Sequence, residues 1–179
     1  MVFAEFLERI VSPDLRAIAI HWDKARGGNA MPSWHQLRPT QIAAQLSIVW
    51  AFQYDRAGNR FTGRLAGERI AGGFGRSFRG LKLEDLHPPE ILPAMQRGLE
   101  RVVNEPALYR LQGVLFRQKE RQGTGERIML PLADGGVQGD GVLGASVVRF
   151  PFADPSYGPV ELANEGAEWF ALSLLTAAA

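Results

Sequence analysis

Residues 48–90 read IVWAFQYDRAGNRFTGRLAGERIAGGFGRSFRGLKLEDLHPPE, and this stretch carries the clearest structural pattern of the chain. Aromatic residues recur at every second position up to Tyr54, which is the period of a β-strand. A polar segment with glycine and asparagine, residues 55–60, separates this strand from a second alternating run that begins at Phe61. The short connection predicts an antiparallel hairpin, and the glycine-rich residues 67–78 predict short helical turns packed on a sheet.

Three helical segments are expected around this hairpin. Ser12 is a suitable N-cap and Pro13 suits a first helical turn, so an amphipathic helix should run from there to the glycines at 27–28. A shorter apolar segment, residues 3–10, precedes it. After the hairpin, an apolar stripe over residues 91–103 predicts a longer connector helix.

The rest of the core has the pattern of strands. Three segments, residues 107–117, 127–132 and 142–150, follow the connector helix and are separated by glycine-rich turns. The first of these turns is expected at residues 122–125. Short loops between consecutive strands favour an antiparallel meander. Beyond the meander, helical spacing resumes over residues 160–178.

The composition argues against several classes of function. The 179 residues are 46% hydrophobic and 22% charged, as in an ordinary globular protein with one core. A net charge of +1 and a pI near 8.2 fall short of a typical nucleic-acid-binding domain. The absence of cysteine excludes disulfides, thiolate catalysis and cysteine-ligated metals, and it gives no sign of an oxidising compartment.

Neither end of the chain predicts a membrane segment. Glu5, Glu8 and Arg9 interrupt the apolar N-terminal residues, unlike the uninterrupted apolar run of a signal peptide. The most apolar part of the tail, residues 169–179, is shorter than the ~20 residues that cross a bilayer. We therefore expect a soluble cytoplasmic protein without a membrane span.

Catalytic and metal sites are only weakly indicated. His87 lies near Asp85 and Glu90, a grouping suited to acid–base chemistry, but a role in shaping the start of the connector helix is the favoured interpretation. His21 and His35 lack metal-ligand spacing with each other. The chain is therefore expected to be neither an enzyme nor a metalloprotein.

The order of strand, strand, helices and three strands resembles that of PAS domains. The resemblance is most specific in the glycine-rich segment and just before the connector helix, at Gly67, Glu68, Arg69, Ile70, Gly75, Gly80, Leu83, Asp85, Leu86, His87 and Pro88. More narrowly, residues 25–28, 31–33, 130–132 and 144–146 are similar to those of small stand-alone bacterial PAS-like proteins.

The resemblance implies an α+β fold in which a five-stranded antiparallel sheet carries short helices and the connector helix on one face. It assigns residues 36–150 to the PAS-like core, residues 1–35 to an N-terminal helical extension and residues 151–179 to a C-terminal helical tail. Flanking helices of this kind often join family members into homodimers, and their apolar residues here are Phe3, Phe6, Leu7, Ile10, Phe170, Leu174 and Leu175. The alternative is that these helices cover the outer face of the sheet.

The resemblance further implies a non-enzymatic sensory or signalling module that binds a small molecule, a signalling protein or both, and acts in trans. The reactive cysteine of light-sensing flavin members is absent, which excludes a flavin photoadduct, and residues 91–103 contain no histidine, which disfavours haem. A small apolar or amphipathic ligand is the leading expectation. The alternatives are a ligand-free interaction scaffold and, less favoured, a small enzyme that uses His87 and Asp85.

A ligand pocket would be lined by apolar residues of the sheet and connector helix together with a few polar groups. The candidate residues are Trp50, Phe52, Phe61, Arg64, Ile70, Phe74, Met95, Leu99, Tyr109, Met129 and Ser146. In the second strand, strict alternation places Phe61, Gly63 and Leu65 on one face and Arg64 on the other.

Overall fold

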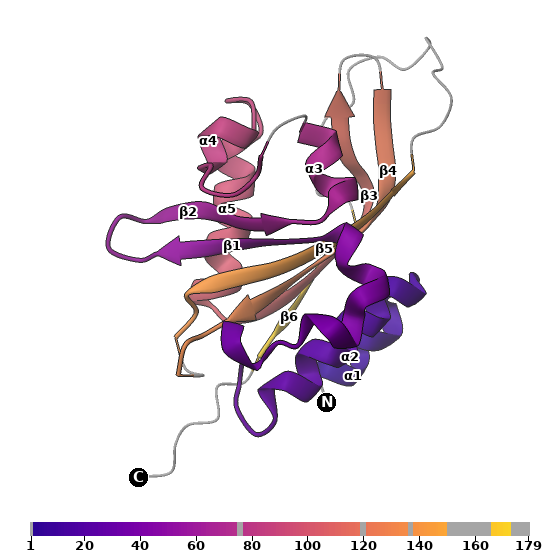
Figure 1. Cartoon of the computed structure of the whole chain (residues 1–179), viewed down its shortest axis with the longest axis vertical. Helices are drawn as coiled ribbons and strands as arrows, with labels where there is room; N and C mark the ends of the chain where they lie inside the picture. The colour runs from indigo at the N-terminus through magenta and orange to yellow at the C-terminus, as the bar shows by residue number, and fades with distance from the viewer. Residues whose placement is uncertain (1, 75–76, 119–120, 136–137, 150–165, 173–179) are drawn as a thin grey trace.

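The computed structural model describes residues 2–74, 77–118, 121–135, 138–149 and 166–172. Within them, one antiparallel sheet forms the centre of the molecule and helices cover both of its faces (Figure 1). The strands are β1 (Val49–Asp55), β2 (Arg60–Ala66), β3 (Ala107–Gln118), β4 (Arg121–Leu132), β5 (Gly141–Arg149) and β6 (Ala167–Ala171). The helices are α1 (Val2–Arg9), α2 (Pro13–Arg26), α3 (Glu68–Phe74), α4 (Leu83–Leu86) and α5 (Leu92–Asn104), with 3₁₀ segments η1 (Trp34–Gln36) and η2 (Pro39–Ile48).

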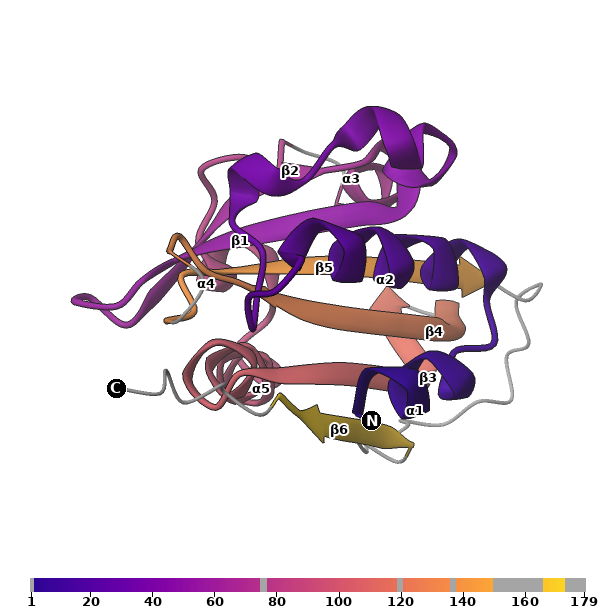
Figure 2. The ribbon, with the colours of Figure 1, turned by 90° about the horizontal axis from the view of Figure 1, so that it is seen from below.

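The strand order in the sheet is β2-β1-β5-β4-β3-β6, which Figure 2 shows from top to bottom. The β1–β2 hairpin and the β3–β4–β5 meander are confirmed. β1 pairs antiparallel with β5 and so joins the hairpin to the meander. The expected α+β architecture, an antiparallel sheet with short helices and one longer connector helix, is therefore confirmed.

The predicted turn at residues 122–125 is wrong. These residues belong to β4, where Gly125 pairs with Gly113 of β3 and with Val148 of β5. The glycine allows close backbone packing, because a side chain at Gly125 would collide with the carbonyl of Val147. A glycine-rich sequence here marks a long strand instead of a turn.

β6 replaces part of the helix predicted at residues 160–178. Residues Ala167–Ala171 form a strand that pairs with β3 from Ala107 to Leu111. Their apolar spacing fits a helix or a strand, and the backbone groups at the edge of β3 favour the strand because they gain partners from it. The sheet therefore has one strand more than expected, and most of the other residues of the predicted helix lie outside the described part of the chain.

α1 and α2 cover the outer face of the sheet. This confirms the alternative prediction for the N-terminal helices, that they pack on the sheet. In Figure 2, α2 runs along β5 and β4 while α1 lies beside β6. Phe6 and Ile10 are buried there, and the indole N–H of Trp22 donates to the carbonyl of Pro131 at 2.9 Å. These apolar residues of the N-terminal segment therefore pack against the sheet, whereas residues 174–175 lie outside the described part.

A buried ion pair fixes the junction between α1 and α2 to the sheet. Arg110 of β3 donates to Glu126 of β4 at 2.7 Å, and both side chains are buried. Glu126 also accepts the backbone amides of Val11 and Ser12, at 3.0 and 2.8 Å, just before α2 begins. A second nitrogen of Arg110 donates to Glu168 of β6 at 2.6 Å. One polar network thus connects the junction to three strands.

α3, α4 and α5 lie on the inner face, over a second apolar core that is distinct from the one under α1 and α2. α4 is a single turn in which the carboxylate of Asp85 accepts the amide of Lys82 at 2.9 Å. His87 ends this turn and donates its backbone N–H to the carbonyl of Leu83 at 2.9 Å. Both residues lie in the segment that precedes α5.

Because of a β-bulge, the residues of β2 do not alternate strictly between the two faces of the sheet. The pairing with β1 shifts after Gly63, and Arg64 is left without a partner in that strand. Phe61 packs in the inner core, whereas Leu65 packs against the outer one. The predicted common face of Phe61 and Leu65 is therefore wrong.

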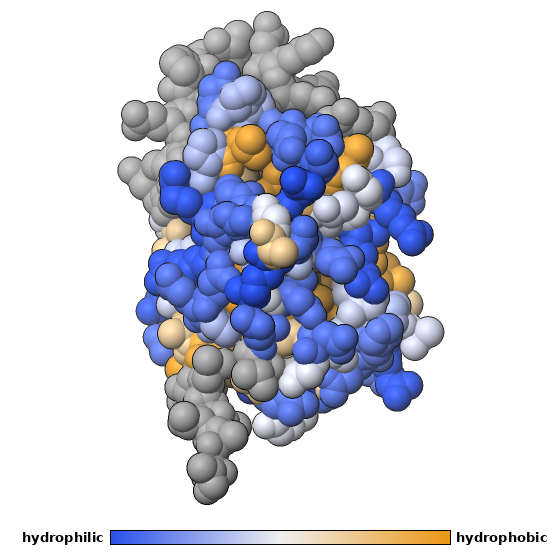
Figure 3. All heavy atoms as spheres, turned by 90° about the vertical axis from the view of Figure 1, so that its left-hand side faces the viewer, coloured by the Kyte–Doolittle hydropathy of each residue, from blue (hydrophilic) through white to orange (hydrophobic). Residues whose placement is uncertain are grey.

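The surface at the left of Figure 1 is mainly hydrophilic. Small hydrophobic areas lie between larger hydrophilic ones on this side of the molecule (Figure 3). None of the described helices is long and apolar enough to cross a bilayer.

Candidate functional site

The inner face of the sheet gathers most of the predicted ligand-binding residues. Seven of them lie in its apolar core, namely Trp50, Phe52, Phe61, Ile70, Leu99, Tyr109 and Met129. Met95 lines the same region from α5, and Ser146 reaches it from β5. Arg64 instead lines a pocket on the outer side of the sheet, and the side chain of Phe74 lies outside the described residues.

A polar cluster of Trp50, Arg127 and Ser146 lies within this apolar face. The hydroxyl of Ser146 accepts a hydrogen bond from the indole N–H of Trp50 and another from Nε of Arg127, both at 3.0 Å. The guanidinium of Arg127 lies 5.6 Å from the centre of the Trp50 ring. All three residues are buried, so the position of each side chain depends on the other two.

Gly144 makes room for this polar cluster. It pairs with Trp50 between β5 and β1, and a side chain at Gly144 would collide with the indole ring. Because that side chain is missing, the ring lies across β5 and reaches Ser146, two residues further along the strand. Gly144, which carries part of the sequence resemblance, is therefore a steric requirement of the cluster.

Sequence reasoning misses Arg127. It pairs with Ser146 between β4 and β5 and lies two residues from Met129, which packs in the inner core. Counting back from Met129 with the strand period of two places Arg127 on the same face. The preceding residue, Glu126, points to the opposite face and holds the α1–α2 junction. Neighbouring residues of β4 thus serve both sides of the sheet.

Burial sets the protonation of the ionisable groups near the cluster. Burial and the nearby charge of Arg127 lower the pKa of His87 from 6.5 to about 4, so its imidazole is neutral at pH 7. Burial raises the pKa of Tyr109, and the charge of Arg127 partly opposes this rise. Burial also lowers the pKa of Arg127, but an arginine stays protonated in proteins and so keeps a positive charge here.

The inner pocket beside the cluster is small. Its lining includes Phe52, Ile70, His87, Met95 and Arg127, and its volume is about 20 Å³. This is room for about one water molecule. A larger ligand would have to displace side chains, and Met95 is only half-buried at the start of α5.

The inner face offers no obvious metal site. Among the residues that the structure describes, no three His, Asp or Glu side chains lie close enough together to hold a metal ion. The carboxylate of Asp85 is exposed and occupied by the amide of Lys82 at the start of α4. The inner face therefore combines apolar surface with the guanidinium of Arg127 and the neutral imidazole of His87.

Comparison with known families agrees with this architecture. Residues 10–147, most of the chain, match the family described as PAS domain. The chain belongs to the PAS domain family. This PAS domain match includes α2 and all of β1 to β4, so it covers the inner site and a helix of the outer face. PAS domains are sensory and signalling modules. No match is found among curated proteins or among solved structures.

Proposed function

We propose that this PAS domain senses a small apolar or amphipathic molecule at the inner face of its sheet and signals to a partner protein through its N-terminal helices. The observation that carries the proposal is the buried polar cluster of Trp50, Arg127 and Ser146. Burying a charged guanidinium costs free energy, so its presence on an apolar face calls for a role that offsets this cost. A recognition role accounts for it.

The residues around the cluster would contact different parts of a ligand. Phe52, Ile70 and Met95 supply apolar surface for the body of a ligand. Arg127 supplies a cationic donor for an acceptor group of the ligand, and the neutral imidazole of His87 offers a further hydrogen-bonding group. The expected ligand is therefore amphipathic, with an acceptor at its polar end.

β4 supplies a direct route from the inner pocket to the N-terminal helices. Arg127 faces the pocket, while Glu126 holds the amides of Val11 and Ser12 on the opposite face. A ligand that draws Arg127 away from Ser146 would shift the backbone of β4 and change that hold. Such a signal is a shift between two arrangements, so the ligand must bind one of them better than the other.

The size of the inner pocket favours a second candidate function. A volume of about 20 Å³ is that of a filled core, and a ligand-free interaction scaffold needs no larger cavity. Such a scaffold would dock a signalling protein on its surface. Both proposals include a homodimer. In each of them the protein acts in trans, and a second copy of the chain is one partner for the surface of the N-terminal helices.

Native mass spectrometry of the purified chain tests ligand sensing against scaffolding. Met95→Trp fills the pocket from α5, whereas Arg97→Trp adds the same side chain on the exposed side of that helix. We expect the wild type and Arg97→Trp to retain a small molecule, seen as extra mass over the denatured chain, and Met95→Trp to lose it. No adduct on the wild type, or an equal adduct on all three proteins, would favour the scaffold. The same spectra report whether the chain is a dimer.

A further inference from the structure

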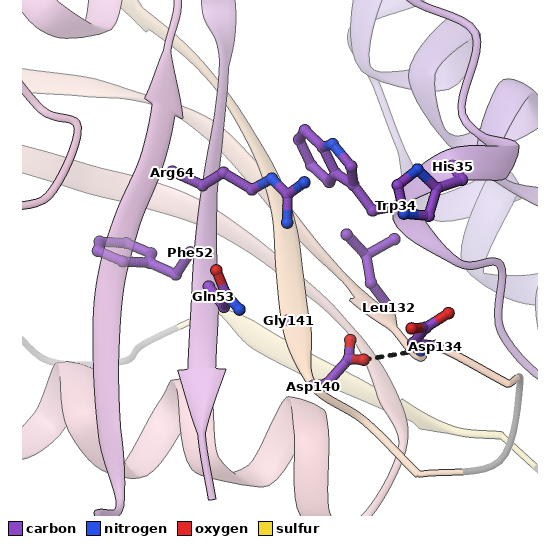
Figure 4. A pocket seen from close by; sticks show the side chains of 9 residues that line it. All are labelled: Trp34, His35, Phe52, Gln53, Arg64, Leu132, Asp134, Asp140 and Gly141. Atoms are coloured by element: carbon purple, nitrogen blue, oxygen red, sulfur yellow. Dashed lines mark hydrogen bonds between the residues drawn. The ribbon is translucent and has the colours of Figure 1, made fainter.

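We propose that a second small-molecule site lies on the outer side of the sheet and binds a zwitterion whose ammonium and carboxylate groups are at opposite ends. The pocket has a volume of about 240 Å³ and lies between η1, β1, β2 and the β4–β5 connection (Figure 4). Phe52 lines both this pocket and the inner one, and the other residues of the two linings differ. This second site does not depend on the function proposed above.

Arg64 forms the cationic end of this outer pocket. Its guanidinium lies 4.1 Å from the centre of the Trp34 ring, on the face of β2 opposite Phe61, as the alternation of the strand predicts. A guanidinium stacked on a ring keeps its N–H donors in its own plane, where they match the two oxygens of a carboxylate. Among the described residues, Arg64 has no hydrogen-bond or ion-pair partner for these donors.

Asp134 and Asp140 form the anionic end. Both belong to the β4–β5 connection and lie at the opposite end of the pocket from Arg64 (Figure 4). The carboxylate of Asp140 accepts the amide of Asp134 at 2.8 Å, which fixes its position. Neither carboxylate has a basic partner within the described part of the chain. Two neighbouring carboxylates attract a cation, and an ammonium group can donate to both.

The middle of the pocket sets the length and character of the ligand. Leu132 lies between the two charged ends and supplies apolar surface, while the amide of Gln53 borders the pocket from β1 (Figure 4). The volume of about 240 Å³ leaves room for a small molecule with several carbon atoms between its two charged ends. A short apolar chain with an ammonium at one end and a carboxylate at the other matches the anionic end, the apolar middle and the cationic end of the pocket.

Calorimetric titration of the full chain with ω-amino acids of increasing length tests this site. The probes are γ-aminobutyrate, δ-aminovalerate and ε-aminocaproate, and the single-charge controls are caproate and hexylamine. We expect at least one of the zwitterions to bind with a Kd of about 1 mM or lower. We expect both controls to bind about tenfold more weakly, because each leaves one charged end without a partner. Absence of binding by all three zwitterions, or equal binding by a control, would overturn the proposal.

Two substitutions locate the binding in the outer pocket. Arg64→Gln removes the cation, and Asp140→Asn removes a carboxylate while keeping an oxygen that can accept the amide of Asp134. Each substitution should lower the affinity for the zwitterion by about tenfold, whereas Met95→Ala in the inner pocket should leave this affinity unchanged. In a parallel NMR titration of the wild type, the indole N–H signal of Trp34 should shift. An affinity that survives both charge-removing substitutions would place the ligand elsewhere and refute the site.

Discussion

Trp50 and Arg127 meet on the inner face although they belong to strands that are not neighbours. β5 lies between β1 and β4, and the contact across it is allowed by the missing side chain of Gly144 and the short one of Ser146. The hydroxyl of Ser146 satisfies one donor from each of the two larger residues. Without it, both donors would lose a buried acceptor, so the cluster depends on small residues in β5 as much as on its large ones.

At the residue scale, His87 should make the domain less stable in acid. Its folded pKa of about 4 lies below the ordinary 6.5, so between these values the unfolded chain binds a proton that the folded chain does not. The free energy of unfolding should therefore fall as the pH decreases from about 6.5 to about 4, by at most about 3 kcal/mol for this group. Urea unfolding of the wild type and His87→Gln at a series of pH values measures the effect.

The comparison separates the effect of His87 from that of other acid-sensitive groups. Burial also lowers the pKa of His21, but that residue is present in both proteins and cancels in the difference. Above about pH 7.5 the two stability curves should run parallel, and below about pH 6.5 the wild type should lose more stability than the variant. Curves that stay parallel throughout the acid range would show that the imidazole of His87 remains in contact with water.

At the scale of elements, the N-terminal helices and β6 depend on one side chain. Arg110 bonds Glu126, which holds the start of α2, and also Glu168, which belongs to β6. α1 and β6 are far apart in the sequence and lie side by side (Figure 2). A change in the position of Arg110 would therefore reach both at once.

Glu126→Gln should loosen the α1–α2 junction and lower the free energy of unfolding by about 3 kcal/mol, because it leaves Arg110 buried with one fewer charged partner. The amides of Val11 and Ser12 should exchange their hydrogens faster, since the acceptor that holds them is weakened. Urea unfolding and amide hydrogen exchange measure the two effects.

An exposed ion pair supplies the matched control. Arg101 and Glu105 form an exposed pair 2.9 Å apart at the C-terminal end of α5, and Glu105→Gln should cost less than about 1 kcal/mol. It should leave exchange at the α1–α2 junction unchanged. If Glu126→Gln behaved like this control, the network around Arg110 would not be what holds the N-terminal helices.

At the scale of the whole molecule, two cores share a single sheet. Leu99 is fully buried in the inner core and Leu130 in the outer one, and β4 and β5 contribute side chains to both. Loss of either core removes support from the same strands. The domain should therefore unfold as one cooperative unit.

Leu99→Ala and Leu130→Ala should each lower the free energy of unfolding by about 2–5 kcal/mol, the usual cost of emptying a buried leucine site. In each variant, circular dichroism and tryptophan fluorescence should give the same urea midpoint, because neither core persists alone. Separate midpoints in Leu130→Ala would instead show that the N-terminal helices detach before the inner core unfolds.

Sequence patterns of short range account for most of the fold. The hairpin, α2 and α5 follow from the spacing of apolar residues and from caps a few positions away, such as the hydroxyl of Ser12 at the start of α2. The same spacing identifies most of the aromatic and apolar residues of the inner face. It does not identify Arg127, because a charged residue in a strand ordinarily predicts a position in water.

The sequence by itself determined the order of the elements, the PAS resemblance and the apolar composition of the inner face, because these depend on neighbours along the chain. Only the tertiary structure decided the strand at Ala167–Ala171, the inner position of Arg127 and the contact of Arg64 with Trp34. Each of these depends on a partner distant in sequence: the edge of β3, the hydroxyl of Ser146 and the ring of Trp34. Local spacing cannot specify such partners, since they come together only when the sheet has formed.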